Sequence, residues 1–211
     1  RGTLAKRKGD RLSARTLFSQ AAGLLGRATA GSNPPSALEL AAIADSMSEL
    51  GQYKEANQVY QSADKLFPGD AVLKARWAQL FASKHNPGDA EGLYREALKV
   101  NAKQPAALIG LAELAAGNWD NKASVLVKQA MDVDPNLAEA KLLLAQVQLE
   151  QENYAEAAKQ LDAIDSVNPK LLEAWSLRAV SEYLQGHIAA LDQQWIPKIL
   201  KENPSYGELF A

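Results

Sequence analysis

The sequence predicts an all-α fold, namely a right-handed solenoid of antiparallel helix hairpins. Two observations lead to this prediction. Helix-favouring residues (Ala, Leu, Glu, Lys and Gln) recur along the whole chain, and long runs of β-branched residues are missing. A pattern of small and large apolar residues also returns about every 34 residues. A single hairpin cannot bury both of its faces, so consecutive hairpins are expected to stack into a superhelix.

The repeating pattern places a small residue, then a large apolar residue four positions later, then another small or apolar residue after three more. Its copies are Ala56, Tyr60 and Ala63; Ala90, Tyr94 and Ala97; Ala123, Val127 and Ala130; Ala157, Leu161 and Ile164; and, upstream, Ala14, Phe18 and Ala21. A last, weaker copy, Leu191, Trp195 and Ile199, begins with a large residue and has a second step of four positions. Proline or another turn residue follows each of the later copies. Spacings of three and four put these side chains on one face of a helix.

These residues and their period resemble the tetratricopeptide repeat. The resemblance covers 37–204 and implies five units, which span 37–70, 71–104, 105–137, 138–171 and 172–204. It implies that 1–36 hold a partial repeat and a Gly/Pro linker, and that 205–211 are the truncated start of a further segment. The first helix of each unit would then line the concave side of the solenoid.

At the N-terminus we expect one basic helix within 1–27, followed by a loop or hinge at 26–36. The loop is predicted by the run Gly31-Ser32-Asn33-Pro34-Pro35, which is rich in turn-forming residues. Residues 1–36 carry seven basic side chains and one acidic side chain, a net charge of +6, which leaves −8 for the remainder. A basic end on an acidic body indicates either a charged partner or a solvated helix face.

The first full unit shows how the sequence sets helix ends. Gly51 supplies the positive φ that ends the first helix, and Pro68-Gly69 ends the second. Asp70 is expected to cap the next helix, and Asn86 followed by Pro87 is expected to do so in the second unit. Alanine at Ala56 and Ala63 allows the two helices of a hairpin to approach closely.

Two later units depart from the pattern. The third unit is one residue short in its turn at 116–120, which contains Trp119. The fifth carries Pro197 inside its second helix, where a proline removes one hydrogen bond and clashes with the preceding turn at a cost of about 3 kcal/mol. We therefore expect a kink or break between Gln193 and Trp195. Trp77, Trp175 and Trp195 occupy core positions of the repeat, whereas Trp119 is either a staple onto the next helix or a partner hot spot.

The sequence contains no arrangement that favours catalysis, so we expect a non-enzyme without a metal or other cofactor. Cysteine is absent, and the two histidines, His85 and His187, lie about three repeats apart, too far to share a metal ion. Zinc-protease, phosphate-loop, nucleophile-elbow and dinucleotide motifs are all missing. No stretch approaches the ~20 apolar residues of a membrane span. The cellular compartment stays open, because cysteine usage does not indicate it.

The resemblance implies a partner-binding groove on the concave side. Family groove positions fall on residues that are mostly acidic or amide-bearing: Asp45, Glu49, Gln79, Glu113, Gln146, Glu150 and Tyr183. The row Asp45, Gln79, Glu113 and Gln146 would hydrogen-bond the backbone of an extended segment while apolar neighbours receive its side chains. The alternative is an empty polar groove, or one filled by flanking sequence.

The expected partner is a protein or peptide segment that is neutral or basic, because the groove positions are acidic to neutral. The Lys, Arg and Asn that clamp a C-terminal carboxylate in chaperone-docking members of the family are missing from their positions here, which disfavours carboxylate capture. Nucleic acid is disfavoured as well, because the body is negatively charged and stacking aromatics with basic neighbours are missing.

Three functions remain open from the sequence. The first is a protein–protein interaction scaffold of bacterial type. In the second, the chain is an accessory region of a larger enzyme, used for substrate presentation or assembly. The segment 203–210, Asn-Pro-Ser-Tyr-Gly-Glu-Leu-Phe, is similar to the helical region that precedes the catalytic domain in some large bacterial gluzincin-type metallopeptidases. The third is a structural spacer that associates with copies of itself.

Overall fold

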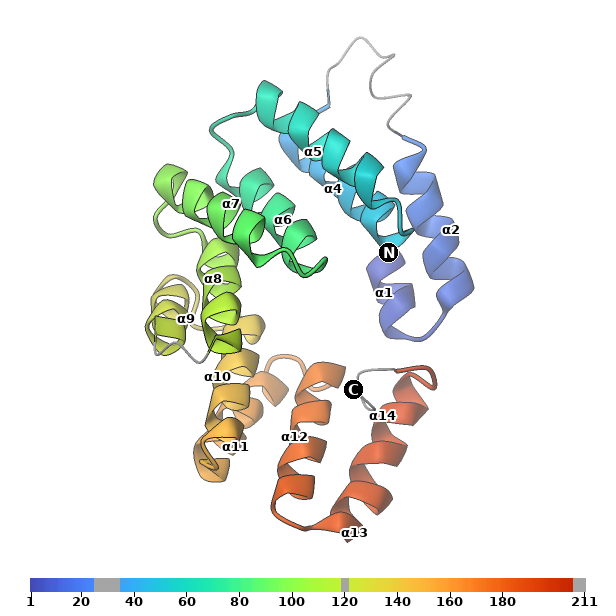
Figure 1. The fold of residues 1–211 in the computed structure, drawn as a ribbon. Helices are drawn as coiled ribbons and strands as arrows, with labels where there is room; N and C mark the ends of the chain where they lie inside the picture. Colours follow the sequence, from blue (N-terminus) through green and yellow to red (C-terminus); the bar gives the residue numbers. More distant parts are fainter. Residues whose placement is uncertain (25–34, 119–121, 207–211) are drawn as a thin grey trace.

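The computed structural model describes residues 1–24, 35–118 and 122–206. In these ranges the fold is all-α, an α-solenoid of antiparallel helix hairpins that forms a right-handed superhelix (Figure 1). The linker expected at 26–36 and Trp119 lie largely or wholly outside the described residues, so their expected roles stay predictions.

Five hairpins follow one another along the chain, each made of an inner and an outer helix (Figure 1). Their helices are α4 (Ala37–Glu49) with α5 (Tyr53–Leu66), α6 (Ala71–Ala82) with α7 (Pro87–Val100), α8 (Pro105–Gly117) with α9 (Lys122–Val133), α10 (Ala138–Glu150) with α11 (Tyr154–Asp165), and α12 (Leu172–Leu184) with α13 (Ile188–Ala190), η1 (Leu191–Trp195) and α14 (Ile196–Glu202).

The N-terminal region corrects one expectation. Instead of a single basic helix it forms two antiparallel helices, α1 (Gly2–Arg7) and α2 (Arg11–Ala22). Gly9 lies between them with φ of 75°, a left-handed conformation that glycine adopts without strain. Asp10 then caps α2 by accepting a hydrogen bond from the Ser13 amide at 3.0 Å. The pair Gly9-Asp10 is a turn-and-cap signal that the prediction of a single helix overlooked.

Helix ends in the first two units form as expected. Gly51 has φ of 81°, Asp70 accepts from the Leu73 amide at 2.8 Å, and Asn86 caps α7 with Pro87 at its first position. An additional capping box forms at α4, where Ser36 and Glu39 bond to each other's backbone amides.

The core consists of successive clusters: the first four each join a hairpin to the first helix of the next, and the fifth lies within the last hairpin. In the first cluster Tyr60 of α5 and Leu73 of α6 are almost completely buried beside Ala44 of α4. The alanines at the close contacts within the hairpins, among them Ala56 and Ala63, are fully buried. Stacking of neighbouring hairpins therefore supplies much of the burial, as expected for a solenoid.

The last hairpin contains the interruption that Pro197 predicted. Its second helix has a π-helical segment at Leu191–Trp195, directly before α14. Pro197 lies in the first turn of α14. A π turn widens the helix by one residue and accommodates a group that cannot continue the α-helical bonding. Trp195 and Trp175 are nevertheless buried, which confirms their core positions, and Trp77 is partly buried against Tyr60.

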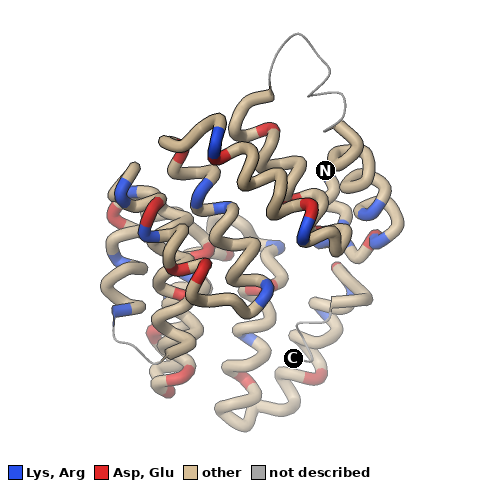
Figure 2. Tube along the Cα trace, turned by 45° about the horizontal axis from the view of Figure 1, so that its top comes forward, with Lys and Arg blue, Asp and Glu red and all other residues tan. Residues whose placement is uncertain are grey.

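The superhelix curves until its two ends approach each other. The turn after α1 and the start of α2 lie next to the end of α14 (Figures 1 and 2). Arg11 Nη2 donates to the carbonyl oxygen of Ser205 at 3.4 Å, across 194 positions of the chain. The inner helices and the α1–α2 pair therefore surround a central hollow.

Candidate functional site

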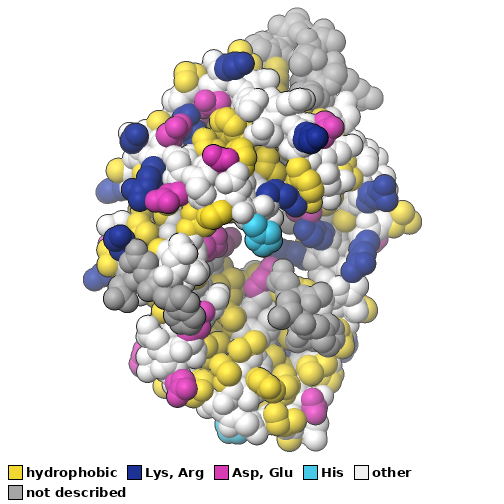
Figure 3. Space-filling model, viewed as in Figure 1, with side chains coloured by type: hydrophobic (Ala, Val, Ile, Leu, Met, Phe, Trp, Pro, Cys, Tyr) yellow, Lys and Arg dark blue, Asp and Glu magenta, His cyan; other side chains and the backbone are white. Residues whose placement is uncertain are grey.

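The candidate site is the central hollow, which Figure 3 shows as an opening between the inner helices and the α1–α2 pair. Four adjoining cavities make up its wall, with volumes of about 530, 350, 440 and 1050 Å³. They share lining residues: Gln79 lines three of them, Glu113 two, and Glu173 two. The cavities therefore form a continuous path along α4, α6, α8, α10 and α12.

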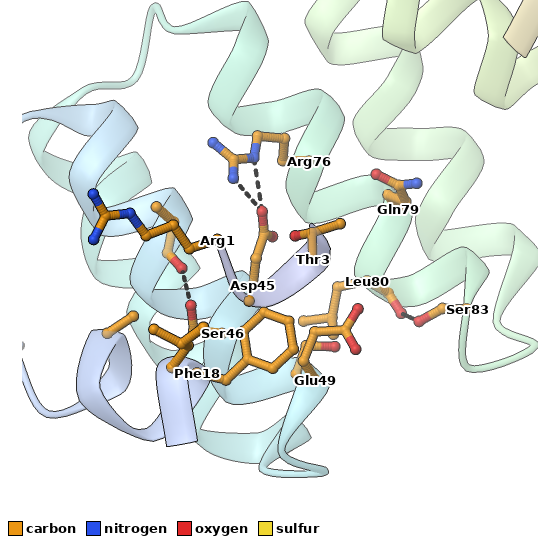
Figure 4. A pocket seen from close by; sticks show the side chains of 15 residues that line it. Arg1, Thr3, Phe18, Asp45, Ser46, Glu49, Arg76, Gln79, Leu80 and Ser83 are labelled. Atoms are coloured by element: carbon orange, nitrogen blue, oxygen red, sulfur yellow. Dashed lines mark hydrogen bonds and ion pairs between the residues drawn. The ribbon is translucent and has the colours of Figure 1, made fainter. Parts of the chain in front are cut away.

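Asp45 lies at the first cavity, but its carboxylate already has partners. Arg76 Nε donates to Asp45 Oδ2 at 2.9 Å, and Arg76 Nη2 donates to the same oxygen (Figure 4). The buried Tyr60 hydroxyl donates to Asp45 Oδ1. Burial, and then the charge of Asp45, raises the pKa of Tyr60, so its hydroxyl stays protonated. Asp45 therefore links α4, α5 and α6, whereas the sequence predicted an acceptor available to the backbone of a bound segment.

Glu49 faces the first and the largest cavities and also has a partner. Its Oε2 accepts from Lys6 Nζ at 2.7 Å. This ion pair links α1 to α4, and it lies at the surface, where such a pair contributes at most about 1 kcal/mol. Glu49 thus helps to position the N-terminal helices beside the hollow.

Gln79, Glu113 and Gln146 come from three successive inner helices and line adjoining cavities. Glu113 shares its cavity with two further acids, Glu139 and Glu173. Partial removal from water, and then the charge of Glu139, raises the pKa of Glu113. The apolar part of this wall includes Leu142, Leu177 and Val180. A row of acceptors beside apolar side chains is thus present along α8, α10 and α12.

Glu150 and Tyr183 lie farther along their helices and outside these four cavities. Gln146 Nε2 donates to Glu150 Oε1 at 3.3 Å, and Tyr183 is 63% exposed. The seven residues expected in the groove therefore divide: five line the hollow, and two lie beyond it.

Sequence reasoning missed a set of basic residues in the wall. Lys6, Arg7, Arg11 and Arg15 of α1 and α2 line the largest cavity together with Glu173 of α12. Figure 2 shows basic residues along α1 and α2, next to the C-terminal hairpin. The available signal was the net charge of +6 at one end of the chain, together with Arg11 and Arg15 four positions apart. Only the curvature of the whole superhelix brings these residues to the groove.

The described residues offer no metal centre, since no three His, Asp or Glu side chains among them are close enough to hold an ion. His85 and His187 occupy separate turns; His85 has φ of 55°, and His187 Nδ1 lies 2.9 Å from Glu182 Oε2.

Over the ranges that the structure describes, no helix combines the length and apolarity required to cross a membrane.

The tetratricopeptide repeat family model matches residues 114–180. Over this range the chain carries the sequence pattern of tetratricopeptide repeats. No curated protein sequence matches it. Among solved structures, a thermophilic tetratricopeptide repeat protein from Thermus thermophilus is 17% identical, with a TM-score of 0.71 over 82% of this chain and 95% of that one. Another, from Parabacteroides merdae, is 20% identical, with a TM-score of 0.66 over 99% and 79%.

A third similar structure is YrrB, described as a tetratricopeptide repeat protein with an unusual peptide-binding site. It is 16% identical, with a TM-score of 0.51 over 91% of this chain and 95% of that one. At these identities the likeness concerns the fold. Tetratricopeptide repeats form extended concave surfaces of the kind that bind other proteins, and this chain has that fold.

Proposed function

We propose that this chain is a non-catalytic scaffold that binds an extended peptide or protein segment in its central hollow. The observation that carries the proposal is the continuous path of cavities in which Gln79, Glu113 and Gln146 follow one another on successive inner helices. Amide and carboxylate groups spaced in this way suit the backbone donors of an extended segment. The peptide-binding site named for YrrB supports the proposal by analogy.

The wall of α8, α10 and α12 favours a neutral or basic segment. Glu113, Glu139 and Glu173 all face the same cavity, beside Leu142 and Leu177. A lysine or arginine of the partner would bring its apolar stem to the leucines and its charge to the carboxylates. Attraction between opposite charges is stronger in this cavity than at an open surface, because part of the water is already displaced.

The test is selection of random peptides on the wild-type chain, followed by calorimetry of the enriched peptides on two variants. The inner variant carries Gln79→Ala and Gln146→Ala, neither of which breaks an ion pair. The matched control carries Gln58→Ala and Gln61→Ala, which remove two exposed amides from the outer helix α5. We expect the inner variant to bind at least about fivefold more weakly, which corresponds to about 1 kcal/mol.

The control is expected to bind like the wild type. Equal affinity of the inner variant and the wild type, together with a loss in the control, would move the binding surface to the outer helices. Failure to enrich any peptide would argue against a peptide-binding role altogether. Circular dichroism of all proteins checks that the helices are intact.

A further inference from the structure

The basic residues of α1 and α2 lead to a further inference, which rests on the proposed function. We propose that Arg7, Arg11 and Arg15 form a carboxylate-binding wall of the hollow, and that the bound segment carries an aspartate or glutamate opposite it. The segment would then be bipolar, with a basic or neutral part at α8–α12 and an acidic part at α1–α2. The hollow would thereby select the direction in which the segment runs.

The first argument is that these arginine charges are not neutralised locally. Among the described residues, Arg7 and Arg15 have no ion-pair partner, and Arg11 bonds only a neutral carbonyl, that of Ser205. Lys6, by contrast, is paired with Glu49. Guanidinium groups bind carboxylates through two parallel hydrogen bonds, so an acidic side chain is the natural complement of this wall.

The second argument is the position of the wall. The three arginines line the cavity of about 1050 Å³, the largest of the four, which Glu173 and Leu172 border on the other side. Glu173 also borders the cavity of Glu113 and Glu139. Walls of opposite charge therefore face one path. An acidic side chain is repelled from the Glu173 side and attracted to the arginine side, and a basic side chain experiences the reverse.

The third argument favours a protein segment over a phosphate-bearing polymer. Carboxylates of Glu49 and Glu173 share the cavity with the arginines and would repel a chain of phosphates. The aromatic residues in the cavity lining are Phe18 and Tyr206, which come from opposite ends of the chain and do not form a row for stacking bases. Isolated carboxylates on an otherwise neutral or basic segment avoid this repulsion.

The experiment compares random peptides selected on three proteins. One is the wild type, one is the variant Arg7→Gln, Arg11→Gln and Arg15→Gln, and one is a control with Lys54→Gln, Lys65→Gln and Lys99→Gln. The control removes the same charge from exposed positions on α5 and α7. Lys6 is left unchanged in every protein so that its ion pair with Glu49 holds α1 in place.

We expect Asp and Glu to be enriched at a fixed place in peptides selected on the wild type and on the control, and this enrichment to vanish on the arginine variant. A wild-type peptide is expected to bind the arginine variant about fivefold to thirtyfold more weakly, and to lose affinity when its sequence is reversed. Its affinity for the wild type is also expected to fall as salt rises.

Enriched peptides without acidic preference, or with equal affinity for all three proteins, would overturn this inference while leaving the proposed function standing. Absence of any enriched peptide would overturn both. RNA and vesicles with anionic headgroups are titrated in parallel. Binding of either that exceeds peptide binding, and that the arginine variant abolishes, would assign the wall to phosphate groups and contradict the proposal.

Discussion

Gly110 shows at the residue scale how one hydrogen atom sets the distance between two helices. A Cβ added to Gly110 of α8 would overlap the ring of Tyr94, a residue of α7 that is only 2% exposed. The ring cannot move aside because it is buried in the second core cluster. We predict that Gly110→Ala lowers the free energy of unfolding by about 1–3 kcal/mol, as for an overpacked core.

Urea unfolding measures this change, and Gly92 of α7 provides the matched control. A Cβ at Gly92 meets no atom within 4 Å. Gly92→Ala is therefore expected to stabilise the chain by about 0.5–1 kcal/mol through helix propensity. Destabilisation by both substitutions to the same extent would show that contact with Tyr94 is not the cause.

Glu113 gives a prediction about pH. Partial removal from water, and then the charge of Glu139, raises the pKa of Glu113 above its usual 4.5, so the folded chain disfavours the ionised form. The resulting destabilisation is fully present above the raised pKa and is relieved as the pH falls through it. Glu113→Gln is thus expected to stabilise the chain at pH 7, by less than about 1 kcal/mol because the side chain still contacts solvent in the open hollow.

The measurement is the free energy of unfolding of Glu113→Gln and wild type between pH 4 and pH 8. The difference should shrink toward zero at the acidic end. As a control, Glu150→Gln removes a charge beyond the hollow and preserves an acceptor for Gln146. A stabilisation by Glu113→Gln that does not depend on pH would exclude the titration of Glu113 as its origin.

At this scale the sequence could predict which residues face the hollow, but it could not predict their contacts. The groove positions of the repeat predicted that Gln79, Glu113 and Gln146 lie on the inner wall, where the structure places them. The partners of Asp45 were not predicted, because Tyr60 and Arg76 reach it from the second helix of the same hairpin and from the next hairpin. Such contacts depend on side-chain rotamers and on helix crossing, which a spacing pattern does not contain.

At the scale of elements, side-chain caps decide where helices begin. Asp70 Oδ1 accepts from the Leu73 amide at 2.8 Å and so satisfies one of the free donors at the start of α6. We predict that Asp70→Ala lowers the free energy of unfolding by about 1 kcal/mol. Asp70→Asn, which retains an acceptor oxygen, is expected to lose much less. Thermal unfolding of both variants checks this, and an equal loss in both would point to the charge instead of the cap.

Most helices could be predicted from their spacing, their alanines and their caps, because these signals are local. Two regions have a form that differs from the prediction: the second helix of the last hairpin and the N-terminal helix pair. The Pro197 interruption was predicted, but its π-helical form was not, because the proline excludes a regular α-helix without specifying the alternative. The pair α1 and α2 was predicted as one helix, because the basic residues continue across the turn at Gly9.

On the scale of the whole molecule, the near-closure of the superhelix could not be predicted from the sequence. Small rotations between neighbouring hairpins add up along the chain, and only their sum brings Arg11 to Ser205. The summed rotations also bring the arginines of α1 and α2 to the hollow. The groove expected from the repeats alone was therefore acidic to neutral, whereas the hollow has walls of both signs.

The two ends of the superhelix contact each other far more weakly than neighbouring hairpins do. Stability in a solenoid arises mainly from contacts between neighbouring hairpins and within them, as in the cluster of Ile199, Trp175 and Trp195. Where the ends meet, Gly9 lies against the side chain of Asn203, and the exposed side chain of Arg11 donates a hydrogen bond to Ser205 at 3.4 Å. An exposed hydrogen bond of this kind contributes at most about 1 kcal/mol, far less than a buried cluster.

We predict that Ile199→Ala, which empties a fully buried position, costs about 2–5 kcal/mol locally. Amide hydrogen exchange should then accelerate over 172–206, while α1 and α2 keep the protection they have in the wild type. Equal acceleration in α2 and α14 would show that the closing contact makes the ring cooperative. The expected result would mean that the two ends can separate while the inner helices stay folded. A partner segment could then enter the hollow between α14 and the arginine wall.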